Sequence, residues 1–273
     1  MSVGIWTFAF DERPVGEVAE AAQEIEELGF DSIWFGEYRG REAFTQAGLL
    51  LAATKRLTVA TGIARFSERT PLAAAAAGRT LAEAHPDRFV LGLGGHLPGD
   101  RPLRRITEYL DGMDAADLSV PRAPHRRVLA ALGPRMLELA AERTDGAHPY
   151  LVPPEHTAIA REALGPKGFL AVEQTVVLDP DPAAARQAAR EFVAGYVGLA
   201  AHHRANLRRL GFTDDDLTEV SDRLVTAIVA FGGEQAVHDR IRAQLDAGAD
   251  HVCVQVLGEG LPRAKWRVLA ELV

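Results

Sequence analysis

The chain has 273 residues, 47% hydrophobic and 25% charged, which suits one large α/β domain or two small ones. Its formal net charge of −8 argues against nucleic acid or an anionic membrane as the main partner. No apolar run is long enough to span a bilayer, and no basic segment precedes the apolar residues that begin at Val3. Cys253 is the only cysteine, which excludes an internal disulfide, and these features together predict a cytoplasmic protein.

Apolar runs alternate with amphipathic segments from the start of the chain. Residues at helical spacing follow the first run and continue to Leu28, where Gly29 ends the helix. The run at 88–94 is uninterrupted, which is typical of a strand buried on both faces of a parallel sheet. The sequence predicts eight strands, at 3–8, 31–36, 57–63, 88–94, 127–132, 146–152, 169–178 and 250–256.

Strands that alternate with helices of this length indicate right-handed βαβ units. Eight units predict an α/β fold, a (β/α)8 TIM barrel that takes up residues 1–273 as one domain. An open doubly wound sheet is the alternative. Residues 182–248 exceed what one crossover needs, and we expect two or three helices there. We interpret this surplus as a helical insertion between strands seven and eight, over the barrel mouth.

Active-site residues of such a barrel lie at the C-terminal ends of the strands. This rule selects Glu37 after strand two, residues 62–66 after strand three, and residues 94–96 after strand four. It also selects His148 and Tyr150 in strand six. Each of these side chains has an ordinary loop or turn role as its alternative.

The last strand has alternating character. His251, Cys253 and Gln255 share one parity, and valines take the other, so we expect the former three to point into the barrel. The neighbouring His202 and His203 point in different directions on a helix, and we expect both at the surface.

The stretch after strand five suits a phosphate group. Gly133 stands where the strand turns, Pro134 at the first helical position, and Arg135 in the first helical turn. Free backbone N–H groups, the helix dipole and a guanidinium all favour an anion at such a position. A normally capped helix with an exposed arginine is the alternative.

Several common motifs are missing. Position 97 is leucine, so the third glycine of G-x-G-x-x-G is absent after Gly92 and Gly94. There is no Walker sequence, no G-x-S-x-G and no H-E-x-x-H. Lysine occurs only at 55, 167 and 265, none of them expected inside the barrel, which argues against Schiff-base chemistry.

The chain resembles bacterial luciferase-like monooxygenases of the branch that uses the deazaflavin coenzyme F-420. The resemblance rests on the order of four segments, 28–34, 57–63, 88–94 and 131–137, the last followed by Asp145-Gly146, and on the closing residues 233–252. It implies a (β/α)8 barrel with flavin or deazaflavin at the strand C-termini. It also implies a bulge and a non-prolyl cis peptide at Gly62-Ile63, behind the cofactor ring. The cofactor phosphate is implied at 133–136, with His148 near it.

The resemblance thus implies cofactor contacts at the ends of strands three to six, from Gly62, Ile63, Gly94, Gly133, Pro134, Arg135, Met136 and His148. Glycines at 92 and 94 then make room beneath the ring. His96 and Glu37 take positions where relatives carry acid or base residues. Two departures are Tyr38, where many members have histidine, and a short loop after Gly95.

We expect an oxidoreductase that transfers a hydride between F-420, or FMN as the alternative cofactor, and a small organic substrate. His96 or Glu37 would move the accompanying proton. Many relatives are dimers, so a homodimer is expected. The alternatives are an FMN-dependent monooxygenase of the same fold, a barrel that binds the cofactor without turnover, and a metal-dependent hydrolase that uses Glu37, His96, His148 and Glu173.

Overall fold

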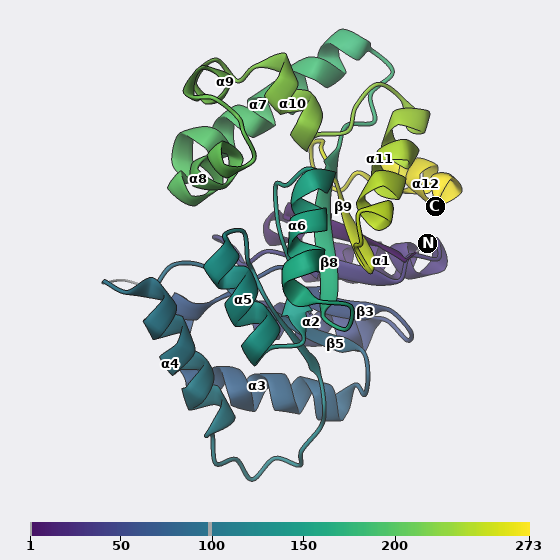
Figure 1. Ribbon diagram of the computed structural model, residues 1–273. Coiled ribbons are helices and arrows are strands. Elements are labelled where there is room, and N and C mark those ends of the chain that lie inside the picture. The colour runs from purple at the N-terminus through teal and green to yellow at the C-terminus, as the bar shows by residue number, and fades with distance from the viewer. Residues whose placement is uncertain (1, 98–99) are drawn as a thin grey trace.

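The computed structural model describes residues 2–97 and 100–273 as a closed parallel β-barrel surrounded by helices (Figure 1). Its strands are β1 Val3–Thr7, β2 Ser32–Phe35, β3 Thr58–Thr61, β4 Ala64–Arg65, β5 Phe89–Gly94, β6 Arg126–Leu129, β7 Gly146–Ala147, β8 Phe169–Val176 and β9 His251–Val256. They pair in the order β3-β2-β1-β9-β8-β7-β6-β5-β4, and a further β3–β5 pairing closes the barrel. Because β3 and β4 are two pieces of one barrel strand, the predicted eight-stranded TIM barrel is confirmed.

Helices connect the strands around the outside of this barrel. They are α1 Val15–Glu27, α2 Ala43–Ala53, α3 Pro71–Ala84, α4 Pro102–Asp114, α5 Pro134–Arg143, α6 Pro154–Leu164 and the closing α12 Arg263–Leu272. The chain between β8 and β9 forms α7 Pro182–Leu199, α8 Ala201–Arg209, α9 Asp214–Glu219, α10 Asp222–Ile228 and α11 Glu234–Asp246. In the described part of the chain, no helix has both the length and the apolar character of a membrane span.

The third barrel strand breaks at the predicted place. β3 ends at Thr61, β4 begins at Ala64, and the peptide bond between Gly62 and Ile63 is cis. The Gly62 amide still donates to the Phe35 carbonyl of β2 over 2.7 Å, so the chain stays in the sheet through the break. The cis peptide that the family resemblance implied is therefore confirmed.

Two sequence expectations are wrong in detail. The sixth barrel strand was expected over 146–152 but ends at Ala147, because Pro149 has no N–H for the ladder and Leu151 takes a φ of 58°. Residues 182–248, expected to hold two or three helices, hold five. Positive φ values at Gly211 (85°) and Val220 (50°) separate the short helices from one another.

The buried apolar residues form separate cores. The larger core lies between the outer faces of the barrel strands and the surrounding helices, and includes Val252 and Trp266. Another core lies mainly among α7, α8, α9 and α10 and includes Val193, Leu207 and Leu224. Figure 1 shows these four helices, in green, gathered beyond one end of the barrel. The C-terminal ends of the strands and this helical group therefore frame the candidate site.

Candidate functional site at the C-terminal end of the barrel

The side chains of β9 alternate between the barrel interior and the outer core, as the sequence predicts. Cys253 packs with Trp6 and Trp34 in a small interior cluster, whereas the valines of β9 belong to the outer core. His251 and Gln255 are buried on the same side as Cys253. The predicted inward orientation of these side chains is confirmed.

Gly62 stands on a floor of aromatic rings. A Cβ at Gly62 would lie 2.6 Å from Trp6 Nε1, 2.9 Å from His148 Nε2 and 3.4 Å from Trp34 Cε3. The Trp6 indole N–H donates to His148 Nε2 over 3.2 Å, and the His148 ring stacks on Trp34 with centroids 4.4 Å apart. Only glycine fits above this floor without displacing a ring.

His148 is held inside the barrel. Its Nε2 accepts from Trp6, so Nδ1 carries the proton and donates to the Ala171 carbonyl over 2.9 Å. Desolvation by burial lowers its pKa to about 4. A neutral ring with both nitrogens bonded supports Gly62 from below. Its implied place near the cofactor phosphate stays a prediction that these contacts do not favour.

Ile63 fills the space next to strand β5. A Cβ at Gly94 would lie 2.7 Å from the Ala130 Cβ and 3.0 Å from Ile63 Cγ1. At Gly92 the space is taken by the Thr61 carbonyl rather than left open beneath a ring. That expectation for Gly92 is wrong, because strand β3 passes too close: Thr61 Oγ1 accepts from the Gly92 N–H over 2.9 Å and donates to its carbonyl over 2.7 Å.

Aromatic side chains also form one wall of the barrel mouth. The Tyr150 hydroxyl donates to Gln255 Oε1 over 2.7 Å and lies 2.7 Å from the Tyr196 hydroxyl of α7. The Trp6 ring lies 4.4 Å from Phe8 and 5.1 Å from Tyr150 between centroids. Burial raises the pKa of Tyr196 to about 12, so the hydroxyl keeps its proton at neutral pH.

His203 joins this wall from α8, and its expected surface position is wrong. It is 6% exposed, with its ring centroid 5.6 Å from Tyr196 and 6.2 Å from Tyr150. Its Nδ1 has no hydrogen-bond partner among the described residues. Burial lowers its pKa to about 3, so the ring is neutral. The adjacent His202 is exposed, as expected.

Glu173 lies deeper, on β8, next to Cys253 in the sheet register. It is 1% exposed, and its oxygens accept from the Thr175 hydroxyl over 2.6 Å and the Leu151 N–H over 3.1 Å. Desolvation raises its pKa to about 7, and these two hydrogen bonds oppose part of that shift. Glu173 is therefore a buried acid whose pKa lies close to neutral pH, without a cationic partner among its contacts.

The carboxylate of Glu37 anchors the loop after β2. Its Oε1 accepts from the Ala43 N–H over 3.1 Å and forms a short ion pair with Arg69, and its Oε2 accepts from the Arg65 N–H over 2.7 Å. Both side chains of the ion pair are 8% exposed. A carboxylate with these three partners is well suited to holding chain segments together.

His96 and Arg135 are both exposed at the rim of the barrel. His96 lies two residues after β5, whereas Arg135 lies in the first turn of α5, where no side chain caps the helix. A second arginine lies closer to this turn: a Cβ at Gly133 would be 3.2 Å from Nη2 of Arg209, which comes from α8. The sequence pointed to Arg135 and missed Arg209, because only the fold brings α8 to α5.

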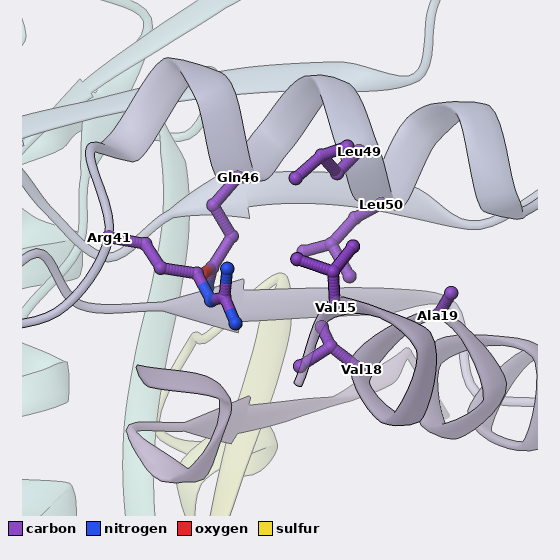
Figure 2. A pocket seen from close by; sticks show the side chains of 7 residues that line it. All are labelled: Val15, Val18, Ala19, Arg41, Gln46, Leu49 and Leu50. Carbon is purple, nitrogen blue, oxygen red and sulfur yellow. The ribbon is translucent and has the colours of Figure 1, made fainter. Parts of the chain in front are cut away.

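Two hollows lie outside this region. One of about 130 Å³ lies between α1 and α2, where Val15, Leu49 and the buried Gln46 line it (Figure 2). A larger one of about 610 Å³ lies between the starts of α7 and α11, next to Phe231. Over residues 2–97 and 100–273, no three His, Cys, Asp or Glu side chains gather as a metal site, which leaves the metal-hydrolase alternative without support.

The fold and the site place the chain in a known family. Residues 1–251 match the family model described as luciferase-like monooxygenase, and the chain belongs to this family of enzymes. It is 28% identical to a Mycobacterium tuberculosis protein named as a putative coenzyme F-420-dependent oxidoreductase, over 81% of each chain.

Two solved structures share the fold. An F-420-dependent secondary alcohol dehydrogenase in complex with an F-420–acetone adduct has a TM-score of 0.76 at 19% identity, over 100% of this chain and 98% of that one. The oxygenating constituent of the 3,6-diketocamphane monooxygenase of Pseudomonas putida, in complex with FMN, has a TM-score of 0.66 at 17% identity, over 100% of this chain and 96% of that one.

The residues at the mouth fit a flat cofactor with a phosphate. Because Gly62 has no side chain, its backbone lies close to Trp6 and His148, and Ile63 lines the barrel next to it. At the start of α5, Arg209 and an uncapped helix turn provide positive charge. Near the tyrosine wall, His203 Nδ1 lacks a partner among the described residues. The described part of the mouth therefore offers apolar contacts near Gly62, positive charge at the start of α5, and a buried imidazole nitrogen on His203.

Proposed function

We propose that the protein is an F-420-dependent oxidoreductase that transfers a hydride between the deazaflavin and a small organic substrate. The observation that carries the proposal is the break between β3 and β4 at Gly62–Ile63, set on the floor of Trp6 and His148 at the C-terminal end of the barrel. The relative named as an F-420-dependent oxidoreductase supports it, because the alignment covers 81% of the chain.

Each part of the mouth has a task in this proposal. Gly62, Ile63 and Gly94 hold the cofactor ring, and Gly133–Met136 lie at its phosphate. A bound deazaflavin supplies the hydride acceptor or donor. Tyr150 and Tyr196 keep their protons and limit the space open to the substrate.

The proton that accompanies the hydride is assigned to His96. Its side chain is exposed at the rim, where a substrate can reach it. Glu37 was the other candidate, but the Arg69 ion pair and two backbone N–H groups occupy its carboxylate. We assign Glu37 to holding the loops after β2 and β4 in place.

The helices between β8 and β9 bound the site in this proposal. We propose that α7–α10 form an insertion over the barrel mouth, because Tyr196 and His203 reach the wall from these helices. We further propose that residues 1–273 act as one domain and that the protein works as a homodimer on a small-molecule substrate in the cytoplasm.

A titration with both cofactors tests the proposal. Purified protein is titrated with F-420 and with FMN, and the F-420 complex is then assayed against alcohols, aldehydes, ketones and enones by cofactor absorbance. We expect F-420 to bind at micromolar affinity or better and to change redox state with at least one substrate class. Tight FMN binding with no F-420 binding would overturn the proposal.

An FMN-dependent monooxygenase is the second candidate. The fold shared with the FMN-bound monooxygenase at a TM-score of 0.66 favours it. Here FMN would bind and substrate oxidation would require oxygen and an external reductant. Oxygen dependence of turnover therefore separates the two enzymes.

A further inference from the structure

We infer that helix α8 supplies the second half of the cofactor-phosphate site, with Arg209 as the cation and Asn206 as a buried donor next to it. The inference rests on the proposed function, because it names residues for the phosphate of the same cofactor. It also moves the cation from Arg135 on α5 to a segment that lies about seventy residues further along the chain.

The first observation is the close approach of α8 to the start of α5. Arg209 Nη2 lies 3.2 Å from the position that a Cβ at Gly133 would take. Gly133 is the N-cap of α5, where no side chain caps the helix, and Pro134 contributes no N–H. The guanidinium and the positive end of a ten-residue helix therefore meet at one point.

The second observation is a polar stripe on α8. His203, Asn206 and Arg209 follow one another at intervals of three residues, so they lie on one side of the helix. His203 contacts the tyrosine wall of the mouth, and Arg209 contacts the start of α5. Asn206 lies between them. The same helix side therefore runs from the proposed ring site to the proposed phosphate site.

The third observation is an unused donor in this stripe. Asn206 is 2% exposed, and its Oδ1 accepts from Arg209 Nη2 over 3.2 Å. Its amide nitrogen Nδ2 has no acceptor among the described residues. A buried donor without an acceptor is costly, and it is retained where a ligand completes it. A phosphate oxygen next to Arg209 would accept from both side chains.

His156 holds the residue that precedes Gly133. It is 1% exposed on α6, and its Nε2 donates to the Leu132 carbonyl over 2.9 Å, one residue before Gly133. That hydrogen bond fixes the end of the segment between β6 and α5, where the first turn of α5 begins. His156 is thus a positioning residue for the loop, and Arg209 and Asn206 are the binding residues.

The test compares ligands that differ only in the phosphate. FMN is set against riboflavin, and F-420 against its deazariboflavin chromophore without the phosphate tail, by equilibrium titration of the full chain. The wild-type protein is expected to prefer the phosphorylated member of the pair that it binds by about 100-fold or more. In Arg209→Gln this preference should fall by about 10- to 100-fold, while affinity for the phosphate-free member stays within about twofold.

Arg208→Gln is the matched control. Arg208 is the adjacent residue, and its Nε pairs with Asp214 over 2.7 Å at the exposed side of α8. The control should keep the wild-type preference. Asn206→Leu should lose part of the preference, about 10-fold, because it removes the buried donor without altering charge. Circular dichroism and the urea midpoint of each variant show whether it has folded.

Two results overturn the inference and are separable from failure of the proposed function. If F-420 or FMN binds but the phosphorylated and phosphate-free members bind equally well, the cofactor assignment survives and the α8 site is wrong. If neither cofactor binds, inorganic phosphate alone is used at constant ionic strength. A phosphate-dependent rise in melting temperature that Arg209→Gln removes supports the anion site; no such rise overturns it.

Discussion

Trp6 and His148 share one hydrogen bond, from the indole N–H to the imidazole Nε2 over 3.2 Å, and both of these atoms lie within 3 Å of the position that a Cβ at Gly62 would take. The pair comes from strands on different sides of the barrel interior, so it ties β1 to the end of β7 at the level of the proposed ring site.

Gly62→Ala tests how tightly the floor is packed. A methyl group there would lie 2.6 Å from Trp6 Nε1, so a ring or the backbone must move. We expect a loss of about 1–3 kcal/mol in unfolding free energy, measured by urea denaturation. The control is Gly16→Ala on α1, where a Cβ meets nothing within 4 Å, and which should be neutral or slightly stabilising.

The buried His148 predicts loss of stability in acid. Its folded pKa of about 4 lies below the ordinary value of 6.5, so the unfolded chain takes up the proton first as pH falls. Its contribution is fully present above pH 6.5, is lost as pH drops toward 4, and amounts to about 3 kcal/mol. Between pH 6.5 and 4, unfolding of His148→Gln should take up about one proton fewer than the wild type, so its unfolding free energy should depend less steeply on pH. An unchanged slope would contradict this.

Glu173 acts in the opposite direction. Its folded pKa of about 7 lies above the ordinary 4.5, so the charged carboxylate destabilises the folded state as pH rises from 4.5 to 7. Glutamine can accept from Leu151 and donate to Thr175 without the charge. We expect Glu173→Gln to gain up to about 3 kcal/mol at pH 8 and little at pH 4.5, by urea denaturation at both. Equal effects at the two pH values would show that titration is not the cause.

Glu37→Gln tests whether Glu37 has a structural role or a catalytic one. The variant removes the buried partner of Arg69 and leaves it only the half-exposed carboxylate of Glu42, 3.0 Å from its Nη2. We expect a loss of about 2 kcal/mol in unfolding free energy, less than a fully unpaired buried charge would cost. Glu108→Gln, in an exposed pair with Arg104, should cost less than about 1 kcal/mol. A Glu37→Gln protein with normal stability and lost turnover would return Glu37 to the chemistry.

His96→Ala tests the proposed proton carrier. We expect cofactor affinity to change by less than about twofold, because the side chain is exposed at the rim, and turnover to fall by about 100-fold or more. His238→Ala on α11 is the control and should change neither quantity. Unchanged turnover in His96→Ala would reduce His96 to a surface residue.

Local patterns were enough to predict the barrel. The alternation of His251, Cys253 and Gln255 with valines depends on neighbours in sequence, and β9 keeps it. The cis peptide at Gly62–Ile63 came from the family resemblance, which no periodicity contains.

The sequence could not predict contacts between distant segments. Arg69 lies 32 residues from Glu37, and their ion pair appears only when β2 and the segment after β4 meet. Arg209 approaches Gly133 from α8. This helix is one of five between β8 and β9, where the sequence predicts only two or three. The three-residue spacing of His203, Asn206 and Arg209 was the available signal, but on a polar helix it also describes a solvated face.

The position of the tryptophans gives the molecule two internal optical reporters. Trp6 and Trp34 lie under Gly62, whereas Trp266 packs in the outer core from α12, and all three are at most 2% exposed. A chromophore seated on Gly62 comes within direct quenching range of the first pair. The emission wavelength of the buried Trp266 also depends on whether α12 remains docked. Filling of the mouth therefore lowers emission intensity, whereas loosening of the barrel wall shifts the emission to longer wavelength, in one unlabelled chain.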